Sequence, residues 1–316
     1  MAACCIPSKK QDGRHERAPE PARAGRRVAE TRLVRIEGAQ FTMGNDSADA
    51  VAGDGEGPAR HVVLSSFSIA PAAVTNREFG DFVRATRYVT EAERVGSAFV
   101  FYLQIPEESR RQARQVAAGL PWWLPVENAA WQLPEGPGSH IHARPDHPVV
   151  HVSWHDAQAY CACAGVRLPT EAEWECAARG GLVQKRYAWG DELTPGGRHF
   201  CNIWQGEFPT RNTEEDGYVG TAPAKSFKPN GYGLYNVAGN VWEWTRDWFS
   251  RDFHAADSPA TRIDPLGPSS GDRKVIRGGS YLCHQSYCNR YRVGARTINT
   301  ADSSTGNTGF RCVRDV

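Results

Sequence analysis

From Gly180 to its end, the sequence contains no long stretch with the apolar spacing of an α-helix. Segments such as NGYGLYNVAGNVWEW and KVIRGGSYLC instead indicate short strands and turns. The 316 residues include 31 glycines, 20 prolines and 10 tryptophans, while the aliphatic content is modest. This combination favours an irregular, loop-rich α+β domain held by aromatic packing over a helical bundle or a parallel α/β sheet.

Regular elements are predicted mainly in the first half of the chain. RLVRIEGAQFTMG and DGEGPARHVVLSSFSIA each predict a strand next to a turn, and VTNREFGDFVRAT predicts a short amphipathic helix capped by Thr75. A second helix is predicted to begin after Ser153 and to end at Gly165. A third follows a capping box formed by Thr170 and Glu173.

The region 95–150 shows no clear period and is dominated by proline, glycine and tryptophan. We interpret it as a long loop region inside the domain, because its tryptophans need a core. No repeat or second domain boundary is evident in the sequence. The prediction is a disordered N-terminal tail over residues 1–30, in which Cys4 and Cys5 are incidental, and a single domain over residues 31–316.

Charge and hydropathy exclude some classes of partner. Lys and Arg number 37 against 36 Asp and Glu, so no basic excess indicates a nucleic acid. The sequence has no apolar run of the length of about 18 residues that predicts a membrane span. The opening 27 residues lack the apolar segment of a secretory signal. We therefore expect a cytoplasmic protein whose nine cysteines stay largely reduced.

Two cysteines near the C-terminus, Cys283 and Cys288, stand five residues apart between aromatic residues and arginines. Three interpretations compete. A disulfide is disfavoured in a reducing compartment, and structural zinc lacks a second cysteine pair, while His284 is too close in sequence to share the metal easily. Two thiolates also suit Cu(I) or a redox couple. Their spacing alone leaves these alternatives open.

Longer motifs extend the interpretation. GGSYLCHQSYCNRYR, NIWQGEFP, PNGYGLYNVAGNVWEW, RLPTEAEWE, HPVVHVSW and DSSTGNTGFRC closely resemble the formylglycine-generating enzymes, or sulfatase-modifying factors, in order from about residue 33. The C-x4-C pair after GGS is the motif most specific to catalytic members. The resemblance implies a variant of the C-type lectin-like fold with low regular secondary structure.

The resemblance also implies an activity. Members oxidise the cysteine of a C-x-P-x-R motif in an unfolded sulfatase to Cα-formylglycine, with dioxygen as oxidant and Cu(I) as cofactor. Cys283 and Cys288 would be the copper ligands and would leave a position for the client thiol. Ser280 would lie by the copper and Tyr287 would form a pocket wall, although they could also be a turn serine and a core tyrosine. A monomer is expected, since the enzyme must admit an extended client segment.

Further residues match family positions at the substrate site. Trp242 corresponds to an active-site residue, and Ser304 and Asn307 correspond to residues that line the peptide groove. Ordinary packing would explain the tryptophan equally well, and a polar turn would explain the other two. Ser97 stands where several relatives carry an acidic residue for the client arginine, so the source of arginine recognition is open.

Calcium is the second metal that the resemblance implies, at two sets of oxygen ligands in a structural role. The first set comprises Asn202, the Ile203 carbonyl, Asp216 and the Tyr218 carbonyl. The second set comprises Asn236, the carbonyls of Gly239 and Val241, and Glu243. Without the resemblance, such residues near glycine would indicate turns.

Three rival functions compete with this one. A sulfoxide-synthase iron site would use an H-x3-H-x-E element, but Ala157 replaces the glutamate after His151 and His155. A non-catalytic, lectin-like binding paralogue is the main alternative, although inactive relatives lack one or both active-site cysteines. The hydrolase motif H-E-x-x-H is absent from the sequence, and G-x-S-x-G occurs once, as GPSSG at residues 267–271, where glycine, proline and serine indicate a turn. Cys161 and Cys312 occupy the places of a disulfide found in some exported relatives, which we do not expect to form here.

Overall fold

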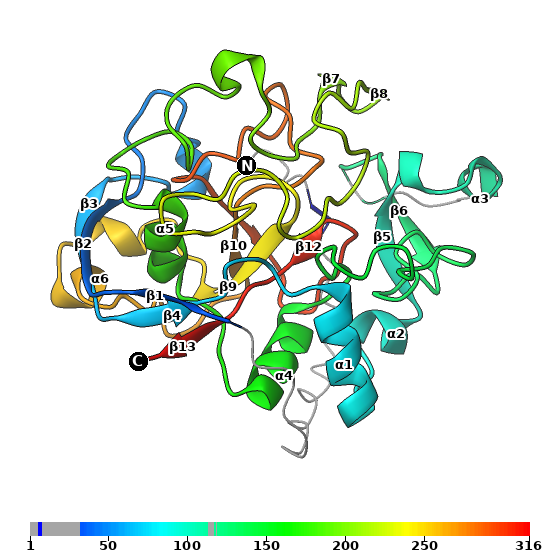
Figure 1. The fold of residues 1–316 in the computed structure, drawn as a ribbon, viewed down its shortest axis with the longest axis horizontal. Coiled ribbons are helices and arrows are strands. Elements are labelled where there is room, and N and C mark those ends of the chain that lie inside the picture. The colour runs from blue at the N-terminus through cyan, green and yellow to red at the C-terminus, as the bar shows by residue number, and fades with distance from the viewer. Residues whose placement is uncertain (1–5, 8–31, 113–116, 118) are drawn as a thin grey trace.

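The computed structural model describes residues 6–7, 32–112, 117 and 119–316. Short helices and strands are joined by long loops (Figure 1). The helices are α1 (Asn76–Thr86), α2 (Glu91–Val95), α3 (Glu107–Gln112), α4 (Trp154–Ala164), α5 (Glu171–Arg179) and α6 (Pro259–Arg262). The strands are β1 (Val34–Ile36), β2 (Ala39–Met43), β3 (Arg60–Leu64), β4 (Phe67–Ile69), β5 (Ser97–Phe101), β6 (Trp123–Glu127), β7 (Gly206–Glu207), β8 (Arg211–Asn212), β9 (Trp242–Trp248), β10 (Lys274–Arg277), β11 (Arg296–Asn299), β12 (Thr308–Gly309) and β13 (Val313–Asp315).

Two small sheets organise the molecule. The four-stranded sheet has the order β11-β10-β9-β12, with β9 antiparallel to β10 and parallel to β12. The three-stranded sheet places β4 between β1 and β13, so that strands from both ends of the described domain flank it. The remaining pairs, β2-β3, β5-β6 and β7-β8, are two-stranded. The prediction of an α+β fold with little regular structure is confirmed.

The three predicted helices are present. Capping boxes begin α1 at Thr75, α4 at Ser153 and α5 at Thr170, and each joins the cap hydroxyl to the backbone N–H three residues on. Gly165 ends α4 in the left-handed conformation. The predicted strands near residues 34–43 and 60–69 are also confirmed, each segment forming two strands rather than one. None of the helices in the described part of the chain is long and apolar enough to span a membrane.

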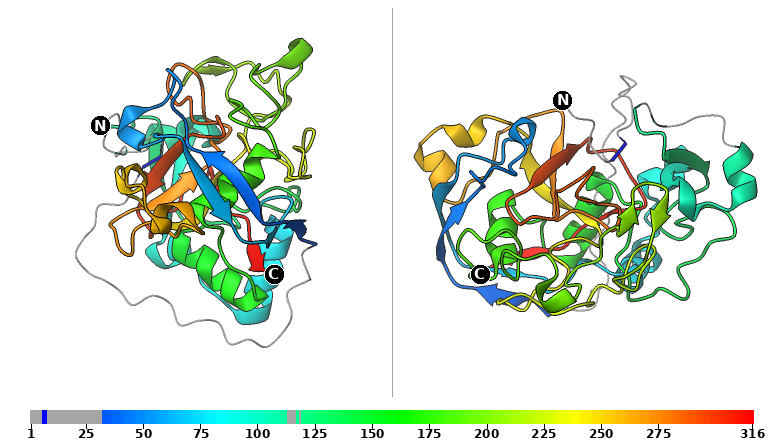
Figure 2. Two further views of the ribbon diagram at one scale, coloured as in Figure 1. Left: turned by 90° about the vertical axis from the view of Figure 1, so that its left-hand side faces the viewer. Right: turned by 90° about the horizontal axis from the view of Figure 1, so that it is seen from above.

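The region expected to be a long loop contains more structure than predicted. β5 and β6 form an antiparallel hairpin within it, and Trp123 and Trp131 are buried as expected. The hairpin lies at one end of the molecule, away from β2 and β3 at the other (Figures 1 and 2). Sequence patterns missed the second strand because Pro125 interrupts it and its outer face is half exposed. Most of the predicted N-terminal tail, with Cys4 and Cys5, lies outside the described residues.

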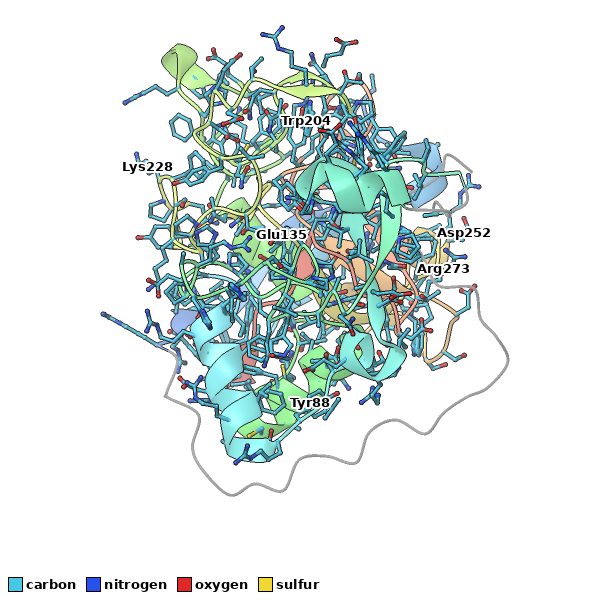
Figure 3. All side chains as sticks on the ribbon, turned by 90° about the vertical axis from the view of Figure 1, so that its right-hand side faces the viewer. Tyr88, Glu135, Trp204, Lys228, Asp252 and Arg273 are labelled. Carbon is cyan, nitrogen blue, oxygen red and sulfur yellow. The ribbon has the colours of Figure 1, made fainter. Side chains whose placement is uncertain are left out.

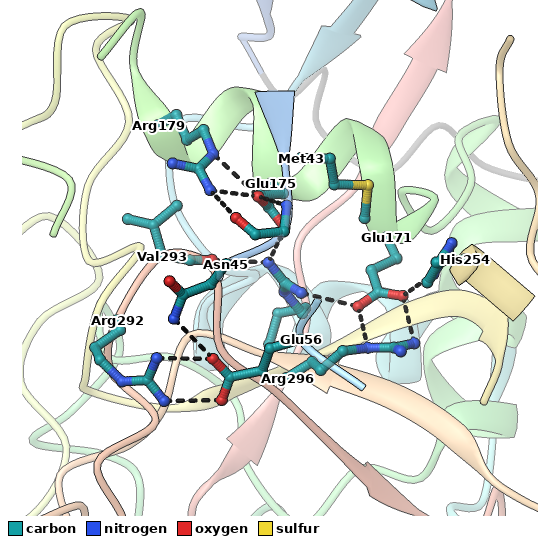
Figure 4. Close-up of polar contacts among 12 residues, drawn as sticks. Met43, Asn45, Glu56, Glu171, Glu175, Arg179, His254, Arg292, Val293 and Arg296 are labelled. Atoms are coloured by element: carbon teal, nitrogen blue, oxygen red, sulfur yellow. Dashed lines mark hydrogen bonds and ion pairs between the residues drawn. The ribbon is translucent and has the colours of Figure 1, made fainter. Parts of the chain in front are cut away.

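A buried network of ion pairs fixes α5 against β10 (Figure 4). Arg277, the last residue of β10, donates to Glu171 at 2.8 Å and to Glu175 at 2.6 Å, one turn apart on α5. Further along the chain, Arg292 donates to both oxygens of Glu56 at 2.7 and 2.8 Å. The loop that carries the two cysteines therefore leaves and rejoins the domain at buried, charge-paired arginines.

Candidate active site

The two cysteines lie on the loop that joins β10 to β11. Its first residues, Gly278 and Gly279, have φ of 94° and 75°. A Cβ on Gly279 would lie 3.0 Å from the Cα of Tyr291, and one on Gly278 would lie 3.1 Å from the Trp174 ring. Only glycine combines this backbone with such close approach, so the GGS motif lets the two limbs of the loop pack against each other.

The Sγ atoms of Cys283 and Cys288 lie 3.1 Å apart, and neither cysteine is in a disulfide. Both residues are fully buried. The backbone N–H of Ser280 donates to Cys283 Sγ at 3.3 Å, and Arg290 Nη1 lies 4.0 Å from Cys288 Sγ. Both donors favour negative charge on the sulfurs, because hydrogen bonds to the charged form stabilise it.

The donor set fits a soft monovalent ion. Within the described ranges, no group of three or more His, Cys, Asp or Glu side chains could hold a metal, so the sulfur pair lacks the four ligands of structural zinc. Two thiolates alone suit Cu(I). The pair therefore has the donor chemistry that such an ion requires.

Ser280, Trp242 and Asn307, predicted from separate motifs, are connected in the structure. Asn307 Nδ2 donates to Ser280 Oγ at 3.0 Å, and the Asn307 carbonyl accepts from the Trp242 backbone N–H at 2.8 Å. Thr305 Oγ1 holds the other side of the Asn307 amide, donating to Oδ1 at 2.8 Å. All four residues are buried. The amide thus links the cysteine loop to the central sheet.

Two predicted substrate-site residues carry unused polar atoms. Trp242 Nε1 and Ser304 Oγ are buried and have no hydrogen-bond partner among the residues that the structure describes. Buried polar atoms are nearly always paired, so unused ones are typical of positions that serve a ligand or water.

Tyr287 forms part of an aromatic wall. Its ring stacks on Phe208 at 4.8 Å and meets Trp122 edge-on at 4.8 Å. Trp204, seen at the top of the side shown in Figure 3, packs in the same region, and its backbone N–H donates to the Cys283 carbonyl at 3.1 Å. Trp122, Trp204 and Phe208 were not predicted as site residues, although the motifs LPWW and NIWQGEFP contain them.

A cavity of about 430 Å³ adjoins the outer side of the cysteine loop. Its lining comprises Arg186, Tyr187, Asp191, Leu193, Gln285, Ser286, Asn289 and Tyr291. A larger cavity of about 950 Å³ includes Cys163 and Cys312 in its lining but none of the predicted catalytic residues. The predicted chemistry therefore does not coincide with this larger cavity.

The first predicted calcium set fits a hard cation. Asn202 is buried and its Oδ1 has no partner in the described part of the chain. Asp216 lies beside it and accepts from the Ile203 and Tyr218 backbone N–H groups at 2.9 and 3.0 Å. Gln205 Nε2 donates both to the Ile203 carbonyl and to Asp216 Oδ2. The partly positive amide hydrogens of Gln205 thus lie between the Ile203 carbonyl and Asp216, where a cation bound by both predicted ligands would lie.

The second predicted set fits less well. Asn236 Oδ1 is buried without a partner in the described residues, as a ligand position requires. Glu243, however, accepts from Arg311 through both oxygens, at 2.7 and 2.6 Å, and from Trp174 Nε1 at 2.7 Å. Its charge is already compensated by a guanidinium, so this carboxylate does not fit a second cation without breaking that ion pair.

The other candidate groups are accounted for structurally. Cys161 and Cys312 approach to 3.6 Å between Sγ atoms without a disulfide, in line with the expectation from the sequence. His151 precedes α4 with φ of 57°, and its Nε2 lies 2.7 Å from the Pro134 carbonyl. Burial lowers the pKa of His151 to about 4. Ser97 begins β5.

Comparisons with known proteins agree with this geometry. The family profile of the Sulfatase-modifying factor enzyme 1-like domain matches residues 18–316. A formylglycine-generating enzyme from Thermomonospora curvata is 61% identical over 296 residues, which cover 93% of this chain and 97% of that protein. One from Bos taurus is 52% identical, covering 96% and 79%. The structure of PvdO from Pseudomonas aeruginosa shares the fold, with a TM-score of 0.63 at 24% identity over 90% of this chain and 94% of that one.

Proposed function

This chain belongs to the sulfatase-modifying factor family, and on that premise we propose that it is a formylglycine-generating oxidase that activates sulfatases. Its substrate is the cysteine of a C-x-P-x-R motif in an unfolded sulfatase, which it converts to Cα-formylglycine. The alternative of a non-catalytic binding paralogue gains no support, because both thiols are present and adjacent.

The observation that carries the proposal is the approach of Cys283 Sγ to Cys288 Sγ at 3.1 Å. Two thiols at this distance can bind one ion together, and the N–H groups of Ser280 and Arg290 support their ionised forms. Cys283 and Cys288 would hold Cu(I), which would supply the electron transfer to dioxygen. Burial of the pair excludes bulk water and limits the loss of reactive oxygen species.

The surrounding residues would bind and orient the client. Tyr287, Phe208 and Trp122 present aromatic faces on which apolar client side chains can pack. Trp242 Nε1 and Ser304 Oγ have hydrogen-bonding capacity that a client backbone can use. Ser280 accepts from Asn307 through its hydroxyl and donates its backbone N–H to Cys283 Sγ, so the hydroxyl can hold a water or an oxygen atom beside the client Cβ.

The balance of the reaction defines what else is required. The client thiol, with one dioxygen, two electrons and two protons, gives the aldehyde, one hydrogen sulfide and one water. The Cβ–S bond breaks and a C=O bond forms, and an external thiol reductant supplies the two electrons. The chain's own role is to place the client Cβ and to exclude water until the sulfur leaves.

We further propose that Ca²⁺ binds Asn202, the Ile203 carbonyl, Asp216 and the Tyr218 carbonyl. The unpaired Asn202 Oδ1 and the amide hydrogens between Ile203 and Asp216 support this assignment. The ion would be structural, because it would cross-link loop segments that lack regular hydrogen bonding. The second set, with Glu243 paired to Arg311, stays a prediction from the resemblance.

The test is a peptide assay. Cu(I)-loaded protein is incubated in air with a thiol reductant and a C-x-P-x-R peptide, and an aminooxy probe traps the aldehyde for mass spectrometry. Cys283→Ser and Cys288→Ser should each abolish product, whereas Cys163→Ser, a partly buried thiol on α4, should retain it. Product formed by either loop variant, or formed equally without copper or dioxygen, would refute the proposal.

A further inference from the structure

Two residues of the predicted N-terminal tail are packed on the domain. Ile6 is only 2% exposed. The Pro7 carbonyl accepts from Ser303 Oγ at 3.0 Å and from Asn299 Nδ2 at 3.4 Å. An apolar side chain that is almost fully buried and a carbonyl with two side-chain donors constitute a specific contact.

The contact lies beside the segment that is predicted to line the peptide groove. Ser303 adjoins Ser304, predicted to line the peptide groove, and both belong to the segment that ends at Asn307, the partner of Ser280. Ile6 belongs to the same buried hydrophobic cluster as Cys283, Cys288 and Trp242. The N-terminal segment therefore reaches the group of residues to which we assign client binding.

The sequence around this contact resembles the client motif. Residues 5–9 read C-I-P-S-K, which matches C-x-P-x-R at the cysteine and the proline and replaces the arginine by Lys9, another cation. A segment with the client's pattern thus has its second and third residues, Ile6 and Pro7, packed beside the predicted peptide groove.

We propose that the N-terminal segment Cys5–Lys9 occupies the client groove as a tethered competitor of the sulfatase motif. The inference rests on the proposed function, since it takes the client motif from there. Residues 10–31 connect the segment to the domain, and a chain of that length spans up to about 75 Å, so the contact is feasible within one molecule.

Lysine in place of arginine makes the segment displaceable. Lys9 offers a point charge where the client offers a planar guanidinium with five donors, so it loses bidentate hydrogen bonds. Tethering offsets this loss, because a short linker gives an effective concentration of about 1 mM. A segment with a dissociation constant of about 0.1 mM would then weaken client binding about tenfold.

The experiment measures binding without copper, so that no turnover occurs. A fluorescent client peptide with serine in place of its cysteine is titrated with the full chain and with a variant lacking residues 1–9, and fluorescence anisotropy gives Kd. The deletion should bind the peptide about tenfold more tightly. Lys9→Arg should weaken peptide binding below that of the full chain, whereas the matched control Lys10→Arg should leave Kd unchanged.

The outcomes separate the inference from the function on which it rests. The proposal that the segment competes with the client would be overturned by equal Kd values for the full chain and the deletion. Equal effects of Lys9→Arg and Lys10→Arg would also overturn it. If both forms then still produce aldehyde with copper and dioxygen, the proposed function stands without it. If neither form binds the peptide or produces aldehyde, the proposed function itself fails.

Discussion

Asn307 Nδ2 donates to Ser280 Oγ at 3.0 Å and so joins the strand-turn segment before β12 to the loop that carries both cysteines. The two residues lie 27 positions apart in the sequence and are both fully buried. Because the same serine donates its backbone N–H to Cys283 Sγ, the position of one thiol depends on this side-chain bond.

Ser280→Ala should reduce both stability and turnover. It leaves the Asn307 amide without its acceptor, and an unsatisfied buried donor costs about 1–3 kcal/mol. Denaturant unfolding measures this loss, and the aldehyde assay should show a lower kcat with a nearly unchanged KM. Ser286→Ala, an exposed serine of the same loop, is the matched control. A Ser280 variant with wild-type kcat would show that the hydroxyl has no part in the reaction.

Copper binding should depend on both thiols. The wild-type chain should bind one Cu(I) per molecule in competition with a chromophoric chelator, and Cys283→Ser and Cys288→Ser should each lose this tight binding, because one sulfur cannot replace two. Cys201→Ser, which removes a buried thiol outside the loop, should retain it. Retention of one tight Cu(I) by either loop variant would contradict the assigned ligands.

Acid should destabilise the domain through Glu171. Burial alone would raise the pKa of this carboxyl, but Arg296, His254 and Arg277 hold it well below its ordinary value. Stabilisation from a carboxylate with a depressed folded pKa is complete above its unfolded value near 4.5 and is lost as the pH falls below that value. The free energy of unfolding, measured as the pH is lowered below about 4, should therefore decrease with acidity.

Glu171→Gln should flatten that dependence and lower stability at neutral pH by about 3–5 kcal/mol, since it leaves Arg277 and Arg296 partly uncompensated. Glu37→Gln, at an exposed carboxylate paired with Arg35, is the control and should change neither quantity appreciably. If the free energy of unfolding of the Glu171 variant kept the wild-type dependence on acidic pH, the groups responsible for that dependence would lie elsewhere.

The contribution of Asp247 to the pH dependence of stability should have the opposite sign to that of Glu171. Burial, followed by the charge of Glu171, raises the pKa of Asp247 to about 7 from 3.8. The unfolded chain ionises first, so this group lowers the free energy of unfolding as the pH rises from about 4 to 7. Asp247→Asn should remove this contribution to the pH dependence. The stability of the variant relative to the wild type should therefore be greater at pH 8 than at pH 5. A pH profile parallel to that of the wild type would refute the assignment.

Calcium removal should lower the melting temperature. An ion present at 100 times its Kd stabilises the folded state by about 2.7 kcal/mol, which a chelator would remove. Asp216→Asn should melt at the lower temperature and show no chelator effect, whereas Asp191→Asn, at an exposed carboxylate, should respond like the wild type. A chelator effect of full size in the Asp216 variant would move the ion to another site.

Local signals in the sequence predicted a good part of this architecture. Capping boxes at Thr75, Ser153 and Thr170 fix the starts of α1, α4 and α5, because the cap and its partner are three residues apart. The cysteine pair was found in the same way, since both thiols stand on one short loop.

Features built from distant residues could not be predicted. Arg277 and Glu171 are 106 positions apart, and a single sequence gives no signal that they pair. The aromatic wall around Tyr287 draws Trp122 and Phe208 from separate loops, and any of ten tryptophans could have supplied such a contact. Motifs identified the candidate site residues, but the aromatic residues that enclose them are brought together only by tertiary packing.

The position of β4 between β1 and β13 has a consequence for biosynthesis. Ile69 pairs with Val34 on one side and with Val313 on the other, so β4 is synthesised long before the strand that covers its second edge. Until the ribosome releases that strand, one edge of β4 remains open to pairing with other chains. Folding of this sheet therefore finishes only after β13 has been synthesised, and the nascent chain depends on being kept apart from its neighbours until then.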